Sequence, residues 1–204
     1  RILHDPGLGV DYLTQAGWID HDNDPDTPLQ AWHAANVPAG TPLSVELHIS
    51  PSQFHQDLGQ IIKGSLARCG IDVTVTALPA TELYAPGPEG PLFGRRFDLT
   101  LLSWGVIPEP DCRLYQSWRI PSDENQWIGT NIAGFSAEDY DQACSGANLA
   151  LPGEQANAYY ASEDAFINSL PAIPLFSAPK VMVFHGQHCV TDLQITGSFC
   201  KIIE

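Results

Sequence analysis

The stretch LSVELHISPSQFHQDLGQIIKGSLARCGIDVTVTA, residues 43–77, decides the fold class. Apolar and polar residues alternate over 43–49 and again over 71–77, which is the period of a half-buried β-strand. Between these runs, apolar side chains recur at helical spacing from Phe54 to Cys69. A strand, a helix and a second strand in this order are typical of a βαβ unit with a right-handed crossover. The sequence therefore predicts an α/β fold.

Both ends of the expected helix carry signals. Ser50 can cap its start, Pro51 suits the first helical position, and Gln53 stands where the partner of a capping box belongs. Gly70 can end the helix in a left-handed conformation. We therefore expect the helix to lie between Ser50 and Gly70.

Further elements are expected on either side of this unit. A third strand is predicted over 97–104, and the loop after it is a place for binding groups, because such groups gather in loops at strand ends. The other expected elements are a short helix over 10–18, helices over 136–147 and 154–170, and short strands over 173–176 and 181–184.

Four aspartates alternate after the first expected helix, at positions 20, 22, 24 and 26. Alternating acids begin a calcium-binding loop, but that loop needs Gly at its sixth position and Glu at its twelfth. Pro25 and Ala31 occupy those positions here. We therefore expect an exposed acidic turn, with calcium binding as the weaker alternative.

Composition excludes some classes of protein. The chain has 204 residues, with 24 Asp and Glu against 9 Lys and Arg, and a formal net charge of -15. Nucleic-acid binding is excluded as a natural function, because surfaces that follow phosphates need clustered Lys and Arg. The hydrophobic fraction of 44% is enough for a packed core. No window has the uninterrupted apolar residues that a membrane span needs.

Five cysteines are present, and no two of them are separated by two residues. Zinc ribbons and thioredoxin-type redox motifs are therefore unsupported, and disulfides in an oxidising compartment are favoured. We favour Cys112 with Cys144, which ties the loop after the third strand to the next helix, and Cys189 with Cys200. Other pairings remain open. Cys69 is expected to be a free, buried thiol.

Catalytic and metal sites find little support. Carboxylates stand close together at Glu138 and Asp141, but no nucleophile elbow, zinc-protease motif or phosphate-binding glycine loop is present. A metal site at His185, His188 and Cys189 is a weak alternative to surface histidines. We predict no catalytic residue, no metal ligand and no cofactor.

Five short motifs occur in a characteristic order over residues 8–185. They are YLTQAGW at 12–18, LARCGIDV at 66–73, FDL at 97–99 leading to SWG at 103–105, Tyr140-Asp141 on a helix, and LPAIPL at 170–175. In this order they resemble the C-terminal lobe of the extracytoplasmic solute-binding proteins of peptide and nickel ABC importers.

The resemblance implies an architecture and a set of partners. It implies a type II periplasmic-binding-protein-like lobe, a mixed sheet flanked by helices, as a fragment of a two-lobed clamp. The expected parts are an initial helix and acidic turn over 1–40, the C-terminal lobe over 41–179, and a segment over 180–204 that returns toward an N-terminal lobe. The expected partners are a small-molecule or peptide ligand and an ABC permease in the membrane. The expected location is extracytoplasmic, in the periplasm or at the cell surface, with a lipid anchor through residues preceding this chain.

The resemblance also implies a ligand site after the third strand. Trp104 matches the family's aromatic residue at that strand's end, and Ser103 and Gly105 offer main-chain groups to an extended peptide. Ile107, Glu109 and Asn131 complete the predicted site. Trp104 filling the core of the lobe is the alternative.

The predicted site departs from the family in one respect. In oligopeptide binders an Asp follows the tryptophan and receives the peptide's amino terminus, whereas Glu109 or Asp111 would serve here at a different spacing. Peptide, amine-bearing and sugar ligands therefore all stay open. A secreted acidic hydrolase, or a sensory or interaction module built on the same lobe, is the alternative function.

Overall fold

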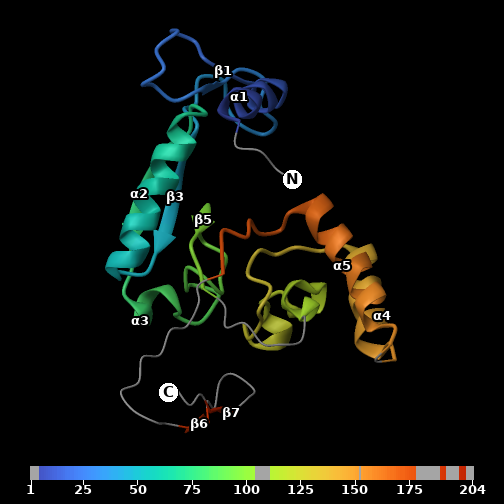
Figure 1. The fold of residues 1–204 in the computed structure, drawn as a ribbon. Helices are drawn as coiled ribbons and strands as arrows, with labels where there is room; N and C mark the ends of the chain where they lie inside the picture. The colour runs from blue at the N-terminus through green and yellow to red at the C-terminus, as the bar shows by residue number, and fades with distance from the viewer. Residues whose placement is uncertain (1–4, 104–110, 152, 178–188, 192–197, 201–204) are drawn as a thin grey trace. The chain divides into compact units, whose positions relative to one another are not determined.

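A computed structural model of the chain describes residues 5–103, 111–151, 153–177, 189–191 and 198–200 (Figure 1). Contacts divide the chain into two compact units. The first unit comprises residues 1–103 and 122–127, and the second comprises residues 104–121 and 128–204. The boundaries predicted at residues 40 and 179 stay predictions.

The centre of the first unit is a parallel three-stranded sheet. Its strands are β3 (Ser44–Ile49), β4 (Asp72–Ala77) and β5 (Leu99–Thr100), in the order β4-β3-β5. Helix α2 (Gln53–Ala67) connects β3 to β4 and lies along the sheet in Figure 1. Val45 pairs with Val73, and Leu47 pairs with both Val75 and Leu99. The predicted βαβ unit is therefore confirmed.

The core of this unit lies between the sheet and α2. Leu47, Ile49, Val73 and Leu101 are buried there, and Ile49 has no exposed surface. The apolar face of α2, which includes Leu58, Ile62 and Leu66, packs against them. The apolar side chains that alternate along the strands therefore pack against those at helical spacing on α2 and form one apolar layer, as the sequence predicted.

The start of α2 differs from the prediction. Ser52 is the residue that caps the helix, because its hydroxyl accepts a hydrogen bond from the backbone N–H of His55 at 3.3 Å. The prediction that Ser50 caps the helix is wrong. Pro51 is not the first helical residue but directly precedes the cap, a position that a proline also fits. The hydroxyl of Ser50 is consequently available for another contact. At the other end, Gly70 has the expected positive φ of 74°.

Strand β5 is shorter than the predicted strand over 97–104. The carboxylate of Asp98 accepts a hydrogen bond from the backbone N–H of Glu46 at 2.9 Å, so a side chain takes the place of a ladder partner there. The ladder begins one residue later, and Leu101 still donates its N–H to the carbonyl of His48 at 3.0 Å. Residues 104–110 lie outside the described part of the chain.

The remaining elements of the first unit precede or follow the sheet. They are α1 (Pro6–Gln15), the antiparallel pair β1 (Trp18–Ile19) and β2 (Gln30–Ala31), the short α3 (Ala80–Leu83) and the 3-10 helix η3 (Asp123–Asn125). Cys69 is a free thiol, as predicted, but it is half-buried, and it donates to the carbonyl of Pro6 at the start of α1 at 3.8 Å.

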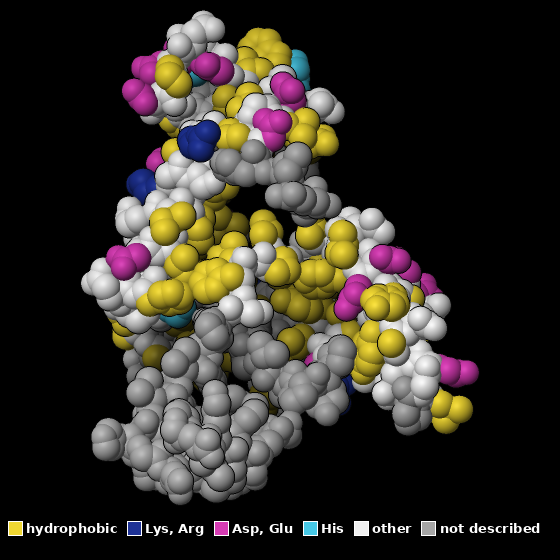
Figure 2. All heavy atoms as spheres, in the orientation of Figure 1, with side chains coloured by type: hydrophobic (Ala, Val, Ile, Leu, Met, Phe, Trp, Pro, Cys, Tyr) yellow, Lys and Arg dark blue, Asp and Glu magenta, His cyan; other side chains and the backbone are white. Residues whose placement is uncertain are grey.

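The acidic turn lies between β1 and β2, and Figure 2 shows acidic side chains gathered over it. Asp20, Asp22 and Asp24 each accept a hydrogen bond from the backbone N–H two residues later, at 3.0 to 3.2 Å. These carboxylates therefore stabilise the turn itself, as aspartates commonly do. The described residues contain no group of three side chains placed to hold a metal ion.

The second unit contains a pair of long helices, α4 (Glu138–Leu149) and α5 (Gln155–Ser169). Before them come the 3-10 helices η1 (Cys112–Tyr115) and η2 (Ser117–Arg119). Tyr140, Cys144 and Ala147 are buried along one face of α4, as the helical spacing predicted. The strands β6 (Cys189–Thr191) and β7 (Ser198–Cys200) form an antiparallel pair with Cys189 opposite Cys200.

Helical spacing in the sequence predicts an apolar stripe on α5, made by Tyr159, Phe166, Ile167 and Leu170, and this stripe is only partly buried. Of the predicted stripe, Tyr159 and Phe166 are half-buried, whereas Ile167 and Leu170 are 58% and 44% exposed. Ser162 is the residue that α5 buries, and Figure 2 shows apolar side chains on this helical pair. The strand predicted over 173–176 is wrong, because these residues are not part of a strand in the structure, and Ile173, Leu175 and Phe176 are exposed. The strand predicted over 181–184 lies outside the described residues.

None of the helices in the described part of the chain has the length and apolar character needed to cross a bilayer.

Candidate functional site

The carboxyl edge of the parallel sheet carries a cluster of polar side chains. The chain crosses from β3 to β4 on one side and later returns to β5 on the other side of β3, so the order β4-β3-β5 reverses direction at β3. In open α/β sheets, ligands bind outside the carboxyl ends of strands at such a reversal. Ser50 follows β3, Ser103 follows β5, and His55 stands in the first turn of α2.

Hydrogen bonds connect these three residues. The hydroxyl of Ser50 bonds to Nδ1 of His55, and Nε2 of the same ring lies 3.4 Å from Oγ of Ser103. A neutral imidazole has one donor and one acceptor nitrogen, and a hydroxyl can complement either of them. Ser103 is exposed, whereas Ser50 and His55 are half-buried. The ring therefore joins the ends of two neighbouring strands and presents polar groups at the edge.

The chemistry of this cluster favours binding. The two ring nitrogens of His55 contact hydroxyl groups, those of Ser50 and Ser103. Hydroxyl and imidazole groups at a strand edge can donate to, and accept from, the polar groups of a bound molecule.

The predicted site residues fall into three groups. Ser103 lies at the carboxyl edge of the sheet, in contact with His55. Trp104, Gly105, Ile107 and Glu109 lie outside the described residues. Asn131 belongs to the second unit and is completely buried.

The side chain of Asn131 holds a loop together. Its amide nitrogen donates to the carbonyl oxygens of Tyr115, Gln116 and Phe135 at 2.9, 3.1 and 2.7 Å. Its amide oxygen accepts from the backbone N–H of Phe135 at 3.1 Å. With no exposed surface, Asn131 has a structural role here, and this accounts for an asparagine at that position without any contact to a ligand.

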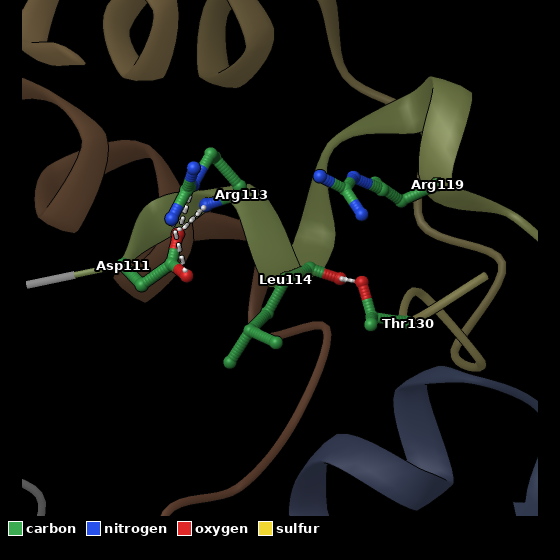
Figure 3. A pocket seen from close by; sticks show the side chains of 5 residues that line it. All are labelled: Asp111, Arg113, Leu114, Arg119 and Thr130. Carbon is green, nitrogen blue, oxygen red and sulfur yellow. Dashed lines mark hydrogen bonds and ion pairs between the residues drawn. The ribbon is translucent and has the colours of Figure 1, made fainter. Parts of the chain in front are cut away.

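The second unit contains a hollow of about 240 Å³, lined by Asp111, Arg113, Leu114, Arg119 and Thr130 (Figure 3). Arg113 and Asp111 form a bidentate pair, with Nε–Oδ1 and Nη2–Oδ2 distances of 2.7 and 3.0 Å. The hydrogen bond from Arg113 is the largest cause that lowers the pKa of Asp111, and the charge of Arg119 lowers it further. Asp111 is thus held as a carboxylate whose oxygens are already engaged, so it offers no free anion for a ligand amine.

A disulfide and a buried tyrosine fix the chain beside this hollow. Cys112 and Cys144 are joined, as predicted, and this bond links η1 to α4. The hydroxyl of Tyr140 donates to the carbonyl of Cys112 at 2.6 Å, and the ring packs edge-on against Phe135. Asp141 accepts hydrogen bonds from the backbone N–H and the hydroxyl of Ser117. A bond between Cys189 and Cys200 stays a prediction, although their backbones are paired.

Burial, the largest cause, raises the pKa of Tyr140 from 10.0 to about 12. A raised pKa means that folding favours the neutral phenol, so this contribution is complete below pH 10 and is lost as the pH rises toward 12. We expect Tyr140→Phe to lower the free energy of unfolding at pH 7 by about 1 to 2 kcal/mol, because the Cys112 carbonyl loses its donor. Urea titration measures this loss, and Tyr160→Phe, at an exposed position of α5, is the matched control. An equal effect of both variants would contradict the assigned role of the Tyr140 hydroxyl.

Sequence reasoning missed three of the residues that matter. Ser50 was assigned to the helix cap, His55 was one of seven scattered histidines, and Arg119 carried no motif. A signal for the first pair does exist, because a hydroxyl directly after a strand and a histidine in the next helical turn lie at the same sheet edge. Arg119 can be found only from the fold.

Similarity to known proteins is clear in structure. No protein-family model and no curated protein matches the sequence. NikZ from Campylobacter jejuni, solved with Ni(L-His), matches 82% of this chain and 31% of its own, with a TM-score of 0.64 and 20% identity. The oligopeptide binding protein from Thermus thermophilus, solved with a pentapeptide, matches 81% of this chain and 28% of its own, with a TM-score of 0.67 and 21% identity.

An ABC transporter substrate-binding protein from Sinorhizobium meliloti is also similar, over 80% of this chain and 29% of its own, with a TM-score of 0.55 and 17% identity. The chain thus spans about a third of the length of the structures it matches. At these identities the likeness concerns the fold. The chain has the α/β fold of one portion of the solute-binding proteins of peptide and nickel importers, and the fold that the sequence motifs predicted is confirmed.

Proposed function

We propose that this chain is the ligand-binding lobe of the substrate-binding protein of an ABC importer, and that it takes peptides or related solutes. The ligand is held between this lobe and a second lobe formed by other residues of the protein. The polar cluster of Ser50, His55 and Ser103 carries the proposal, because it occupies the reversal point of the sheet in a fold shared with NikZ and an oligopeptide binding protein.

Trp104 extends this cluster in the proposal. It directly follows Ser103 in the sequence, and Ser103 lies at the carboxyl edge of the sheet. An aromatic ring there supplies a flat apolar surface beside polar groups, a combination that ligand sites favour. Ser103 and Gly105 supply main-chain groups for an extended ligand.

The proposed role is binding without catalysis, with delivery to an ABC permease. The similar structures include a substrate-binding protein of an ABC transporter, and His55 is bordered by hydroxyls. The disulfide between Cys112 and Cys144 supports an extracytoplasmic location, because such bonds persist in oxidising compartments.

The test is a ligand screen on the protein expressed from its complete gene. Peptides, sugars and nickel chelates are added, and the melting temperature is measured, since binding stabilises the folded state. We expect a peptide or a related solute to raise the melting temperature. His55→Ala should weaken its binding about tenfold, the effect of losing one or two polar contacts to a ligand. Trp104→Ala should abolish the shift.

His21→Ala is the matched control, because His21 lies at the exposed acidic turn. It should leave the affinity unchanged. Turnover of chromogenic hydrolase substrates without any ligand-induced shift would contradict the transport function and favour a hydrolase. A His55→Ala variant that binds as tightly as the parent protein would remove the polar cluster from the site.

A further inference from the structure

We propose that the hollow at Arg119 binds a carboxylate group of the ligand. The inference rests on the proposed function in one respect only, namely that the molecule carrying the carboxylate is the imported solute. It concerns the second unit alone, and the residues involved are Asp111, Arg113, Leu114, Arg119 and Thr130.

Charge is the first argument. Arg113 and Arg119 are the only cationic side chains among the described residues of the second unit, and both line the same hollow. The surrounding acidic residues of the unit are distributed over its helices: Glu138, Asp139, Asp141, Glu154, Glu163 and Asp164. In a protein with a formal net charge of -15, two arginines at one hollow form a local positive site that favours an anion.

The availability of Arg119 is the second argument. Arg113 is engaged by Asp111, and this pair is close to neutral. The guanidinium of Arg119 has no hydrogen-bond or ion-pair partner within the described ranges, and Figure 3 shows it directed across the hollow toward the Asp111–Arg113 pair. The hollow therefore carries one uncompensated positive charge. A planar guanidinium matches the two oxygens of a carboxylate, which it binds in a bidentate manner.

The rigidity of the backbone at Arg119 is the third argument. Its carbonyl oxygen accepts a hydrogen bond from the N–H of Asn131 at 3.1 Å. A Cβ at Gly129 would come within 2.1 Å of that same oxygen, so the loop passes Arg119 as closely as a glycine allows. Thr130 donates its hydroxyl to the carbonyl of Leu114 at 3.2 Å, across the hollow. Binding then has to order the arginine side chain and little else, which favours affinity.

The size of the hollow limits what it takes. Its volume of about 240 Å³ is below the roughly 300 to 1,000 Å³ of pockets that enclose a whole small molecule. It therefore accommodates one end or one side chain of a ligand. Leu114 adds an apolar wall against which the carbon atoms next to the carboxylate can pack.

The direct test uses acetate and the protein expressed from its complete gene. The Nε–H signals of the arginines are followed by NMR during a titration with sodium acetate at constant ionic strength, with chloride as the reference anion. Loss of one signal in Arg119→Gln assigns that residue. We expect the Arg119 signal to shift in a saturable way with acetate, while the signal of Arg95, which lies in the first unit, does not. A linear, unsaturated shift shared by all arginines would overturn the proposal.

The second arm asks whether the ligand uses this site. Trialanine and trialanine amide differ in the carboxylate, so their affinities are compared in the parent protein, in Arg119→Gln and in Lys63→Gln. Lys63 lies on the exposed face of α2, so Lys63→Gln removes the same charge elsewhere. We expect the amide to bind about 10-fold to 100-fold more weakly than the acid, and Arg119→Gln to remove this preference while Lys63→Gln keeps it.

The outcomes separate the two proposals. Equal binding of acid and amide, unchanged in Arg119→Gln, overturns the carboxylate site and leaves the transport function intact. Saturable acetate binding at Arg119 without binding of any solute in the screen supports the carboxylate site and contradicts the transport function.

Discussion

Replacing Asn131 by Ala is expected to lower the free energy of unfolding by about 3 to 5 kcal/mol, the upper part of the range for single substitutions. The buried amide bonds to three carbonyl oxygens and one backbone N–H, which belong to Tyr115, Gln116 and Phe135. Alanine removes all four hydrogen bonds, and each buried group that is left unsatisfied costs about 1 to 3 kcal/mol. The carbonyl of Gln116 keeps one donor, the backbone N–H of Arg119 at 2.9 Å. Urea titration followed by tryptophan fluorescence measures the change.

Asn131→Asp makes the same test more demanding. The aspartate has nearly the same shape, but it replaces the donor with an acceptor that faces three carbonyl oxygens. We expect it to destabilise the protein at pH 7 at least as much as alanine does. Asn157→Ala, on the exposed surface of α5, is the control and should change the free energy of unfolding by less than about 0.5 kcal/mol. Full stability of both Asn131 variants would disprove the structural role.

Removing the Cys112–Cys144 disulfide is expected to cost about 2 to 4 kcal/mol. The bond joins residues separated by 32 positions, and its loss restores conformational freedom to the unfolded chain. The double variant Cys112→Ser/Cys144→Ser isolates this bond from the others that a reductant would break. The free energy of unfolding of this variant is compared with that of the parent protein under oxidising conditions.

Cys69→Ser is the matched control, because Cys69 is a free thiol in the structure. It should lower the stability by less than the double variant does. Alkylation of the native protein, followed by mass analysis of its peptides, gives an independent check. Labelling of Cys112 or Cys144 without reductant would contradict the bond.

Local patterns predicted the centre of the fold correctly. The alternation in β3 and β4 and the helical spacing of α2 depend on neighbours in sequence, and these elements share one apolar core. The pairing of Cys112 with Cys144 also followed from local reasoning, because the bond joins a loop to the next helix. Such features are encoded within short windows of the chain.

Features that depend on distant contacts were not predictable. The third strand begins at Leu99 and not at residue 97 as predicted, because the carboxylate of Asp98 accepts a hydrogen bond from Glu46, which is far away in the sequence. Ser50 was predicted as the cap of α2, but Ser52 caps the helix in the structure, and Ser50 contacts His55 instead. The stripe predicted on α5 is buried only in part, since Phe166 packs against Tyr115 while Ile167 is exposed.

The candidate site was predictable only in part. Ser103 was named from the end of a strand, and it does lie at the edge where the strand order reverses. Asn131 was also predicted to contact the ligand, but its side-chain amide forms hydrogen bonds with surrounding backbone groups. No property of an isolated asparagine distinguishes a buried loop support from a ligand contact, because both roles use the same donors and acceptors.

The turn over 111–121 has a consequence for how specificity can evolve. Its backbone is held by Asn131, by Asp141 and by the disulfide, none of which uses the side chain of Arg119. Shape and selectivity are therefore encoded at different positions. In the proposed carboxylate site, a mutation at position 119 alone would change the preference of the hollow from anions to neutral or cationic groups without disturbing the loop that presents it. Under the proposed function, selection would thus act on the bound solute while the architecture of this loop stays constant.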